Sequence, residues 1–127
     1  MALQVELVSP ERILYSGEAD MVVARTSEGD IAFLSGHAPF IGALGIGAVT
    51  IRSTDGSDER AAVHGGFVEV SGDRVTILSD VAELAGDIDA DRARRALEAA
   101  ERRTSDLDDV EAEAALRRAR LRVELAS

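Results

Sequence analysis

The residues best suited to acid–base chemistry in this sequence are its two histidines, His37 and His64. Neither belongs to an HxH, HExxH or HxxxH pattern, and a zinc or iron site needs three or more clustered ligands. No GxSxG elbow supports a serine nucleophile, and the lack of cysteine removes thiolate ligands, a thiol nucleophile and disulfides. We therefore predict structural or surface roles for both histidines, no metal site and no catalytic residues.

Acidic residues alternate as Asp87, Asp89 and Asp91, as they do at the start of a calcium loop. The glycine and the terminal bidentate glutamate that complete such a loop are missing. Acidic side chains also stabilise the N-terminus of a helix by interacting with its dipole. This second explanation is the better one, and it predicts a helix start here.

Arg117, Arg118, Arg120 and Arg122 crowd the end of the chain. The guanidinium group is a planar, permanently charged donor that pairs with phosphate or carboxylate. Such a cluster fits an anionic ligand or an acidic protein surface, and it equally fits the solvated face of a helix. The sequence leaves these three interpretations open.

The chain as a whole is acidic, with 24 acidic against 14 basic residues and a formal net charge of -10. This charge argues against binding to nucleic acid or to anionic lipid surfaces. No apolar run approaches the roughly 20 residues of a membrane span, and no signal peptide is recognisable. We expect a soluble intracellular chain that meets a membrane only as the peripheral part of a larger complex.

Two parts of the chain must position these residues, and the first part has the pattern of a β domain. Residues 1–86 hold the glycines, both prolines and every aromatic residue. Short apolar alternations lie between turn signals such as Asp55-Gly56, Gly65-Gly66 and Ser71-Gly72-Asp73. The expected strands are 3–7, 12–16, 20–26, 30–34, 48–52, 59–64, 66–70 and 74–78. Short strands at this spacing predict a β-sandwich or a flattened barrel over residues 1–86.

Residues 87–127 lack glycine, proline and aromatic residues, and they predict an antiparallel helical hairpin. Asp87 or Asp89 caps the first helix, which runs to about Thr104. Asp108 with Glu111 resembles a capping box for the second helix. The spacing of Leu107, Val110, Ala114, Leu121 and Leu125 predicts a seam that faces a partner helix.

Alanine dominates the facing stripe of this hairpin, so the two helices can approach closely but remove little apolar surface from water. Burial contributes roughly 25 cal/mol per Å², and helices of this length are only marginally stable alone. We therefore predict a weakly docked hairpin that can exchange one set of contacts for another.

Four segments together resemble the epsilon subunit of bacterial F-type ATP synthases. They are Val8-Ser9-Pro10-Glu11-Arg12, Glu28-Gly29-Asp30-Ile31 with Gly36-His37-Ala38-Pro39, Gly65-Gly66-Phe67-Val68-Glu69-Val70, and residues 75–83. They follow one another in the family's order and spacing along nearly the whole chain. A proline commonly precedes the Gly-His pair in the family, whereas Ser35 stands here.

The resemblance implies a ten-stranded β-sandwich followed by an antiparallel two-helix hairpin, in a non-catalytic subunit of the central rotor of a proton-driven ATP synthase. In this family the sandwich binds the gamma subunit and rests on the polar loops of the rotor ring, at the cytoplasmic face of the bacterial membrane. The resemblance places Asp30, Ser35, Gly36, His37, Ala38 and Pro39 at this interface. It implies that His37 shapes a turn and presents a surface.

The resemblance also implies a regulatory role for the helices. They either lie beside the sandwich or extend into the alpha/beta catalytic hexamer and block ATP hydrolysis. Arg117, Arg118, Arg120 and Arg122 are then the residues that meet an acidic stretch of the hexamer. Pairing of arginine with carboxylate would supply the differential contact that such a change of state requires.

Some relatives in this family bind ATP between the helices and so hold the compact state. Their signature is matched by Ile88-Asp89-Ala90-Asp91-Arg92-Ala93, preceded by Glu83. The resemblance therefore implies a weak regulatory ATP site formed by Glu83, Ile88, Asp89, Arg92, Ala93 and Arg122. The chain requires no cofactor under this interpretation.

Two other hypotheses come from different functional classes. One is a free-standing β-sandwich interaction module that dimerises through residues 87–127. The other is a small hydrolase within the β domain, whose turnover would depend on His37 or His64.

Overall fold

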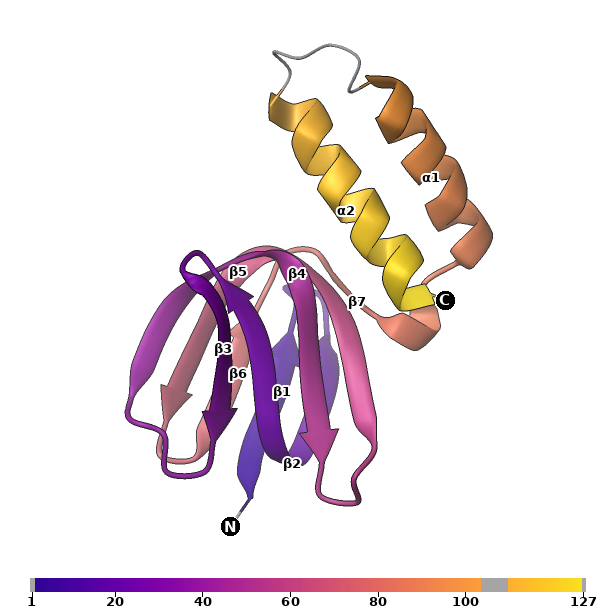
Figure 1. Ribbon diagram of the computed structural model, residues 1–127. Coiled ribbons are helices and arrows are strands. Elements are labelled where there is room, and N and C mark those ends of the chain that lie inside the picture. Colours follow the sequence, from indigo (N-terminus) through magenta and orange to yellow (C-terminus); the bar gives the residue numbers. More distant parts are fainter. Residues whose placement is uncertain (1, 104–109, 127) are drawn as a thin grey trace.

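The structure is a computed structural model that describes residues 2–103 and 110–126. A rolled β domain comes first in the chain, and a pair of helices stands beside it (Figure 1). The strands are β1 (Leu3–Val8), β2 (Ile13–Thr26), β3 (Gly29–Leu34), β4 (Phe40–Ser53), β5 (Asp58–Ser71), β6 (Arg74–Leu78) and β7 (Ala82–Leu84). They are followed by a 3-10 turn, η1 (Ala85–Asp87), and by the helices α1 (Ala90–Arg103) and α2 (Val110–Ala126).

The predicted combination of a β domain and two helices is confirmed, but the ten-stranded count is wrong for the described residues, which form seven strands. The count of ten came from the family resemblance, and the apolar runs predicted eight segments; both exceed seven because the strands are long. β2, β4 and β5 each run for 14 residues, or about 45 Å at 3.3 Å per residue. Each long strand bends through the domain, so that sequence runs such as 12–16 and 20–26 belong to one strand.

The sheet closes on itself through β1. This strand pairs antiparallel with β2 and parallel with β6, and the order β1-β6-β5-β4-β2 completes a ring. β3 extends the sheet beyond β2, and the short β7 pairs with β5. Closure leaves few free strand edges, which would otherwise be open to pairing with other chains.

The core of the β domain lies inside this ring and follows the two-residue period of the strands. In β1 the side chains of Leu3, Val5 and Leu7 point inward and are essentially inaccessible to water. Phe33 from β3 is the largest fully buried side chain. This interior consists of aliphatic side chains and Phe33, and neither His37 nor His64 belongs to it.

Gly65 and Gly66 do not form the turn that the sequence pattern predicts. Both lie inside β5, with φ of 92° and 115°. A Cβ atom placed on Gly66 would lie 2.0 Å from the carbonyl oxygen of Leu78 in β6. Both glycines supply the positive φ with which β5 bends, and at Gly66 no other residue tolerates both the dihedral angle and the close contact with β6.

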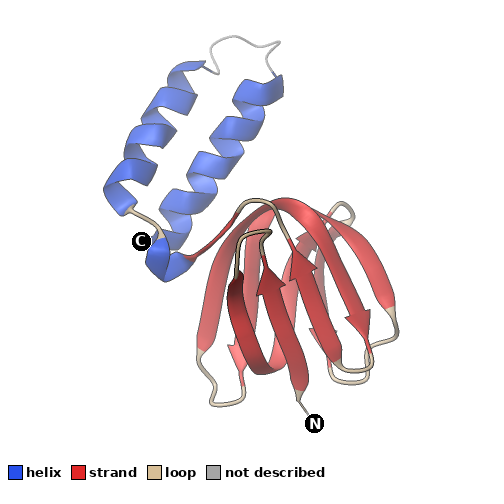
Figure 2. Ribbon diagram, turned by 180° about the vertical axis from the view of Figure 1, so that it is seen from behind, coloured by secondary structure: helices blue, strands red, loops and turns tan. Residues whose placement is uncertain are grey.

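α1 and α2 form an antiparallel pair joined to the sandwich at the η1 end (Figure 2). The buried residues of α1 are Ala93 and Ala100, and α1 packs chiefly against α2. Asp89 caps α1, because its carboxylate accepts a hydrogen bond from the Arg92 backbone N–H at 3.1 Å. Neither described helix has the length and apolar character of a membrane-spanning segment.

The predicted seam of α2 is partly wrong. Val110 is 77 % exposed, whereas Leu121 and Leu125 are buried against the sandwich and not against α1. The buried alanines Ala112 and Ala119, seven residues apart, lie on a different stripe of α2. Leu121 and Leu125 pack against the sheet because it offers a larger apolar surface than the alanines of α1. The predicted Leu107 contact and Asp108 cap fall outside the described residues.

The helical pair meets the sandwich through a small apolar cluster that is separate from the main core. Ala62, Leu121 and Leu125 form its buried part, and the partly buried Ile46, Ala48, Ala85 and Ile88 surround them. The contact buries little apolar surface, and weak docking of the hairpin stays a prediction.

Replacing Gly66 by alanine should lower the free energy of unfolding by about 3 kcal/mol or more, from dihedral strain and the backbone clash together. Urea denaturation followed by circular dichroism would measure this loss. Gly56→Ala is the matched control, because Gly56 also has a positive φ of 88° but no atom lies within 4 Å of its added Cβ. Its cost should stay near 1 kcal/mol. Equal losses in the two variants would contradict the close-packing argument.

Candidate interaction and nucleotide sites

The loop from Ser35 to Pro39 connects β3 to β4 and is held at both sides. The Gly36 N–H donates to the Asp73 carboxylate at 2.7 Å, which ties the loop to the β5–β6 turn. The His37 ring contacts Phe33 edge-on, with 5.0 Å between centroids, and its Nδ1 lies 2.7 Å from the Ala38 carbonyl oxygen. His37 thus closes this end of the core and shapes the loop, while Ala38 and Pro39 are exposed.

Asp30 lies near the start of β3, toward the opposite end of that strand from His37. Its carboxylate accepts two hydrogen bonds from Arg25 on β2, at 2.9 and 3.2 Å. The hydrogen bonds from Arg25 lower the pKa of Asp30 below its usual value. The structure therefore does not bring Asp30 and the Gly36–Pro39 loop into one patch, although about half of the Asp30 side chain is exposed.

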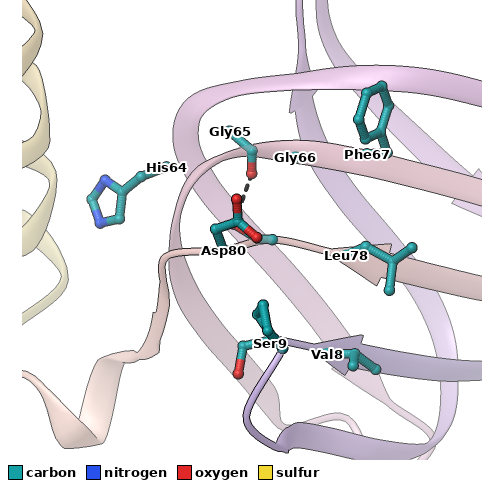
Figure 3. Close-up of a pocket in the computed structure, with 10 residues that line it drawn as sticks. Val8, Ser9, His64, Gly65, Gly66, Phe67, Leu78 and Asp80 are labelled. Carbon is teal, nitrogen blue, oxygen red and sulfur yellow. Dashed lines mark hydrogen bonds between the residues drawn. The ribbon is translucent and has the colours of Figure 1, made fainter.

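An apolar strip, formed by Ile41, Phe67 and Leu78, crosses the outer face of β4, β5 and β6. Their exposed fractions are 74 %, 59 % and 49 %, and Phe67 faces Leu78 across the β5–β6 ladder. Figure 3 shows Phe67 and Leu78 beside a shallow cavity of about 300 Å³ that also reaches Val8 in β1.

The sequence analysis missed this strip, although its signal was present. In Gly66-Phe67-Val68-Glu69-Val70 the strand period puts Val68 and Val70 inside and Phe67 outside. A large aromatic side chain that faces solvent beside other exposed apolar side chains is typical of an interaction surface.

A second cavity of about 240 Å³ lies between the end of the sandwich and the helices. All six residues of the predicted nucleotide site line it, and they are Glu83, Ile88, Asp89, Arg92, Ala93 and Arg122. Within the cavity the Arg122 Nε–H donates to the Glu83 carboxylate at 2.5 Å. The site therefore contains an internal ion pair that joins β7 to α2.

The four arginines of α2 do not form one stripe. Arg118 and Arg122, one turn apart, are partly covered and are engaged by Glu111 at 2.6 Å and by Glu83. Arg117 and Arg120 are exposed and border a third cavity of about 280 Å³ near Arg25. Only Arg117 and Arg120 thus present their charge outward in this arrangement.

Among the residues that the structure describes, no group of three or more His, Asp or Glu side chains is arranged to hold a metal ion. The His64 side chain is only 2 % exposed; the residue borders the cavity beside Phe67 and Leu78, and its ring is directed toward α2. Its ring nitrogens are without hydrogen-bond partners.

The β domain matches the family model described as "ATP synthase, Delta/Epsilon chain, beta-sandwich domain" over residues 2–85. The chain belongs to the delta/epsilon family of ATP synthase subunits. An ATP synthase epsilon chain of Streptomyces griseus is 50 % identical over 121 residues, which cover 95 % of this chain and 92 % of the relative. One from Thermobifida fusca is 49 % identical over 127 residues, covering 98 % and 91 %.

Two solved structures of ATP synthases contain chains with the same fold. A chain of the Euglena gracilis mitochondrial ATP synthase superposes with a TM-score of 0.83 at 24 % identity, covering 98 % of this chain and 81 % of that one. A chain of the Tetrahymena thermophila enzyme gives 0.65 at 19 % identity, with 100 % and 98 % covered.

Membership in the delta/epsilon family confirms the resemblance to the epsilon subunit. The chain is a non-catalytic rotor subunit of an ATP synthase. This role replaces the hypotheses of a free-standing dimeric module and of a small hydrolase. The contacts of individual residues with other subunits remain predictions.

Proposed function

We propose that the two parts of this subunit perform two tasks. The sandwich couples the gamma subunit to the rotor ring of a proton-driven ATP synthase, and the helical pair restrains ATP hydrolysis when it leaves the sandwich. The observation that carries this proposal is the contrast between the closed β domain and the helices, which touch it through one small cluster. The subunit would act at the cytoplasmic face of the bacterial membrane, as a peripheral part of the complex.

We assign the gamma contact to the apolar strip of Ile41, Phe67 and Leu78. Exposed apolar patches of this kind mark protein interfaces, and an aromatic residue at the centre of such a patch commonly dominates the binding energy. The apolar side chains of the strip are already exposed and release water when a partner covers them, while the exposed Glu69, opposite Ile41 in the β4–β5 ladder, adds one negative charge beside the strip.

We assign the ring contact to the loop from Ser35 to Pro39. Its backbone is fixed by the Gly36–Asp73 hydrogen bond and by the packing of His37 on Phe33. A rigid loop loses little conformational freedom when it binds. Asp30 remains a predicted second contact with the rotor ring. The Asp30 carboxylate would then bind both Arg25 and the loops of the rotor ring.

The restraint on hydrolysis is assigned to α2. Arg117 and Arg120 are exposed in the docked arrangement, while Arg118 and Arg122 are paired with Glu111 and Glu83. Release of the helix would free Arg122 from Glu83 and make it available for carboxylates on the catalytic hexamer. Binding to the hexamer then supplies the free energy that favours the released state.

A weak regulatory ATP site between η1, α1 and α2 is our third assignment. The support is the convergence of Glu83, Asp89, Arg92 and Arg122 on one cavity. Its volume of about 240 Å³ lies below the roughly 300–1,000 Å³ of most ligand pockets. The triphosphate would therefore extend to the open side, where Arg92 and Arg122 offer their charges.

Phe67→Ala should weaken binding of the purified chain to gamma by about 2–4 kcal/mol, because it removes the central aromatic side chain of the strip. Surface plasmon resonance with immobilised gamma would measure this change. Val110→Ser is the control, since Val110 is 77 % exposed but lies on α2. Unchanged affinity in Phe67→Ala would refute the assigned gamma contact.

Deleting residues 88–127 should raise ATP hydrolysis by the assembled enzyme by about fivefold or more, the lower end of usual coupling between sites. Assembly should persist, because the sandwich has its own core. The double variant Leu121→Asp, Leu125→Asp keeps the helices but breaks their apolar contact with the sandwich. It should lower hydrolysis. The same rate in all three enzymes would contradict the restraint while leaving the coupling role intact.

Isothermal titration with ATP should show weak, saturable binding that Arg92→Ala reduces by at least about tenfold, the usual cost of losing a charge-assisted hydrogen bond. Arg74→Ala is the control, because Arg74 is exposed on β6, outside the cavity. Failure to detect saturable heat would remove the nucleotide site without affecting the other two assignments.

A further inference from the structure

His64 is the most unusual polar residue in the described part of the chain. It belongs to β5, but its ring turns toward α2 and away from the cavity beside Phe67 and Leu78 (Figure 3). The side chain is 2 % exposed, and neither Nδ1 nor Nε2 has a hydrogen-bond partner. Burying unsatisfied polar atoms costs free energy, so this residue weakens the contact in which it lies.

The groups facing His64 are charged. Nε2 lies 3.7 Å from Glu83 Oε1 of β7, too far for a hydrogen bond but close enough for a strong charge interaction. The same Glu83 oxygen accepts the hydrogen bond from Arg122. Arg118, one turn earlier on α2, also acts on the ring through its charge, and β4 places the apolar Ile46 opposite His64.

Glu83 is therefore shared between the sheet and the helix. It holds Arg122 of α2 directly, and it faces His64 across a short gap. A neutral imidazole leaves this carboxylate entirely to Arg122. An imidazolium would compete for it and would stand next to two like charges, Arg118 and Arg122.

We propose that His64, Glu83 and Arg122 form a proton-sensitive latch, which holds α2 on the sandwich while His64 is neutral and loosens when His64 is protonated. The latch lies beside the cluster of Ala62, Leu121 and Leu125, which supplies the apolar half of the same contact. The two halves together determine how often α2 leaves the sheet.

The sign of the effect follows from the titration of His64. Burial, and then the charge of Arg122, lower the pKa of His64 from 6.5 to about 4 in the docked state. Once α2 is released the ring meets water, and its pKa returns to about 6.5. The released state therefore binds the proton more tightly, and docking is lost progressively as the pH falls through 6.5 toward 4.

With these two pKa values, lowering the pH from 7.5 to 5.5 raises the ratio of released to docked helix by about tenfold. If the helices restrain hydrolysis as proposed above, acidification strengthens that restraint. This consequence rests on the proposed function, whereas the latch itself concerns only the isolated subunit and can be tested without the assembled enzyme.

The test uses an engineered thiol beneath α2. The chain contains no cysteine, and Ala62 is fully buried under the helix, so a thiol in Ala62→Cys reacts only when α2 opens. The labelling rate of an unfolded peptide with the same thiol, divided by that of the protein, gives a protection factor at each pH. This ratio removes the pH dependence of the thiol itself.

From pH 7.5 to 5.5 the protection factor should fall about tenfold more in the Ala62→Cys parent than after adding His64→Leu. His64→Gln should behave like His64→Leu, and it replaces that variant if leucine prevents folding. His37→Leu is the matched control, because it removes the other histidine and should keep the full pH dependence. Equal pH dependence in the parent and both His64 variants would overturn the latch.

Nuclear magnetic resonance provides an independent measurement on the full chain. The imidazole of His64 should titrate near pH 4, and it should move to about 6.5 when Leu121→Asp releases α2. A value near 6.5 in both proteins would also overturn the proposal. A confirmed latch with no effect of pH on hydrolysis would contradict only the proposed restraint.

Discussion

The close approach of β5 and β6 at Gly66 is the constraint on which the remaining structure depends. Any side chain at this position would meet the carbonyl oxygen of Leu78. Because Gly65 and Gly66 both adopt positive φ, β5 can bend and still pair with β4, β6 and β7. The bend places Phe67 on the outer face of the sheet and directs His64 toward α2. One backbone feature thus positions both the apolar strip and the contact with α2.

The two parts of the molecule differ in how strongly they are held. The β ring encloses an aliphatic core whose side chains are inaccessible to water, and such a core unfolds only as a unit. The helices contribute alanines to each other and two leucines to the sheet. A buried histidine without hydrogen bonds lies at this second contact. This division fits the proposal that the helices leave the sandwich while the β domain stays attached to the rotor.

Sequence reasoning identified the family from its glycine-containing motifs and the helical tail from its composition. The family resemblance implied ten strands and the apolar runs gave eight segments, because short runs cannot reveal that a long, bent strand such as β5 continues through a glycine pair. Sequence reasoning also assigned Leu121 and Leu125 to the helix seam, since a spacing of four residues fits either neighbour. His64 was considered only as a catalytic or structural candidate, and nothing in its local sequence shows that Glu83 and Arg122 face it.

The sequence alone determined the period of each segment, the change from strands to helices after Gly86, the net negative charge and the membership in the ATP synthase family. These properties are local or additive, so they can be read along the chain. Tertiary structure decided which residues share a surface: Phe67 with Ile41 and Leu78, and His64 with Glu83 and Arg122. Such neighbours are separated by up to about 60 positions, and only the closure of the sheet and the docking of α2 bring their side chains within a few ångströms, where charge and burial act.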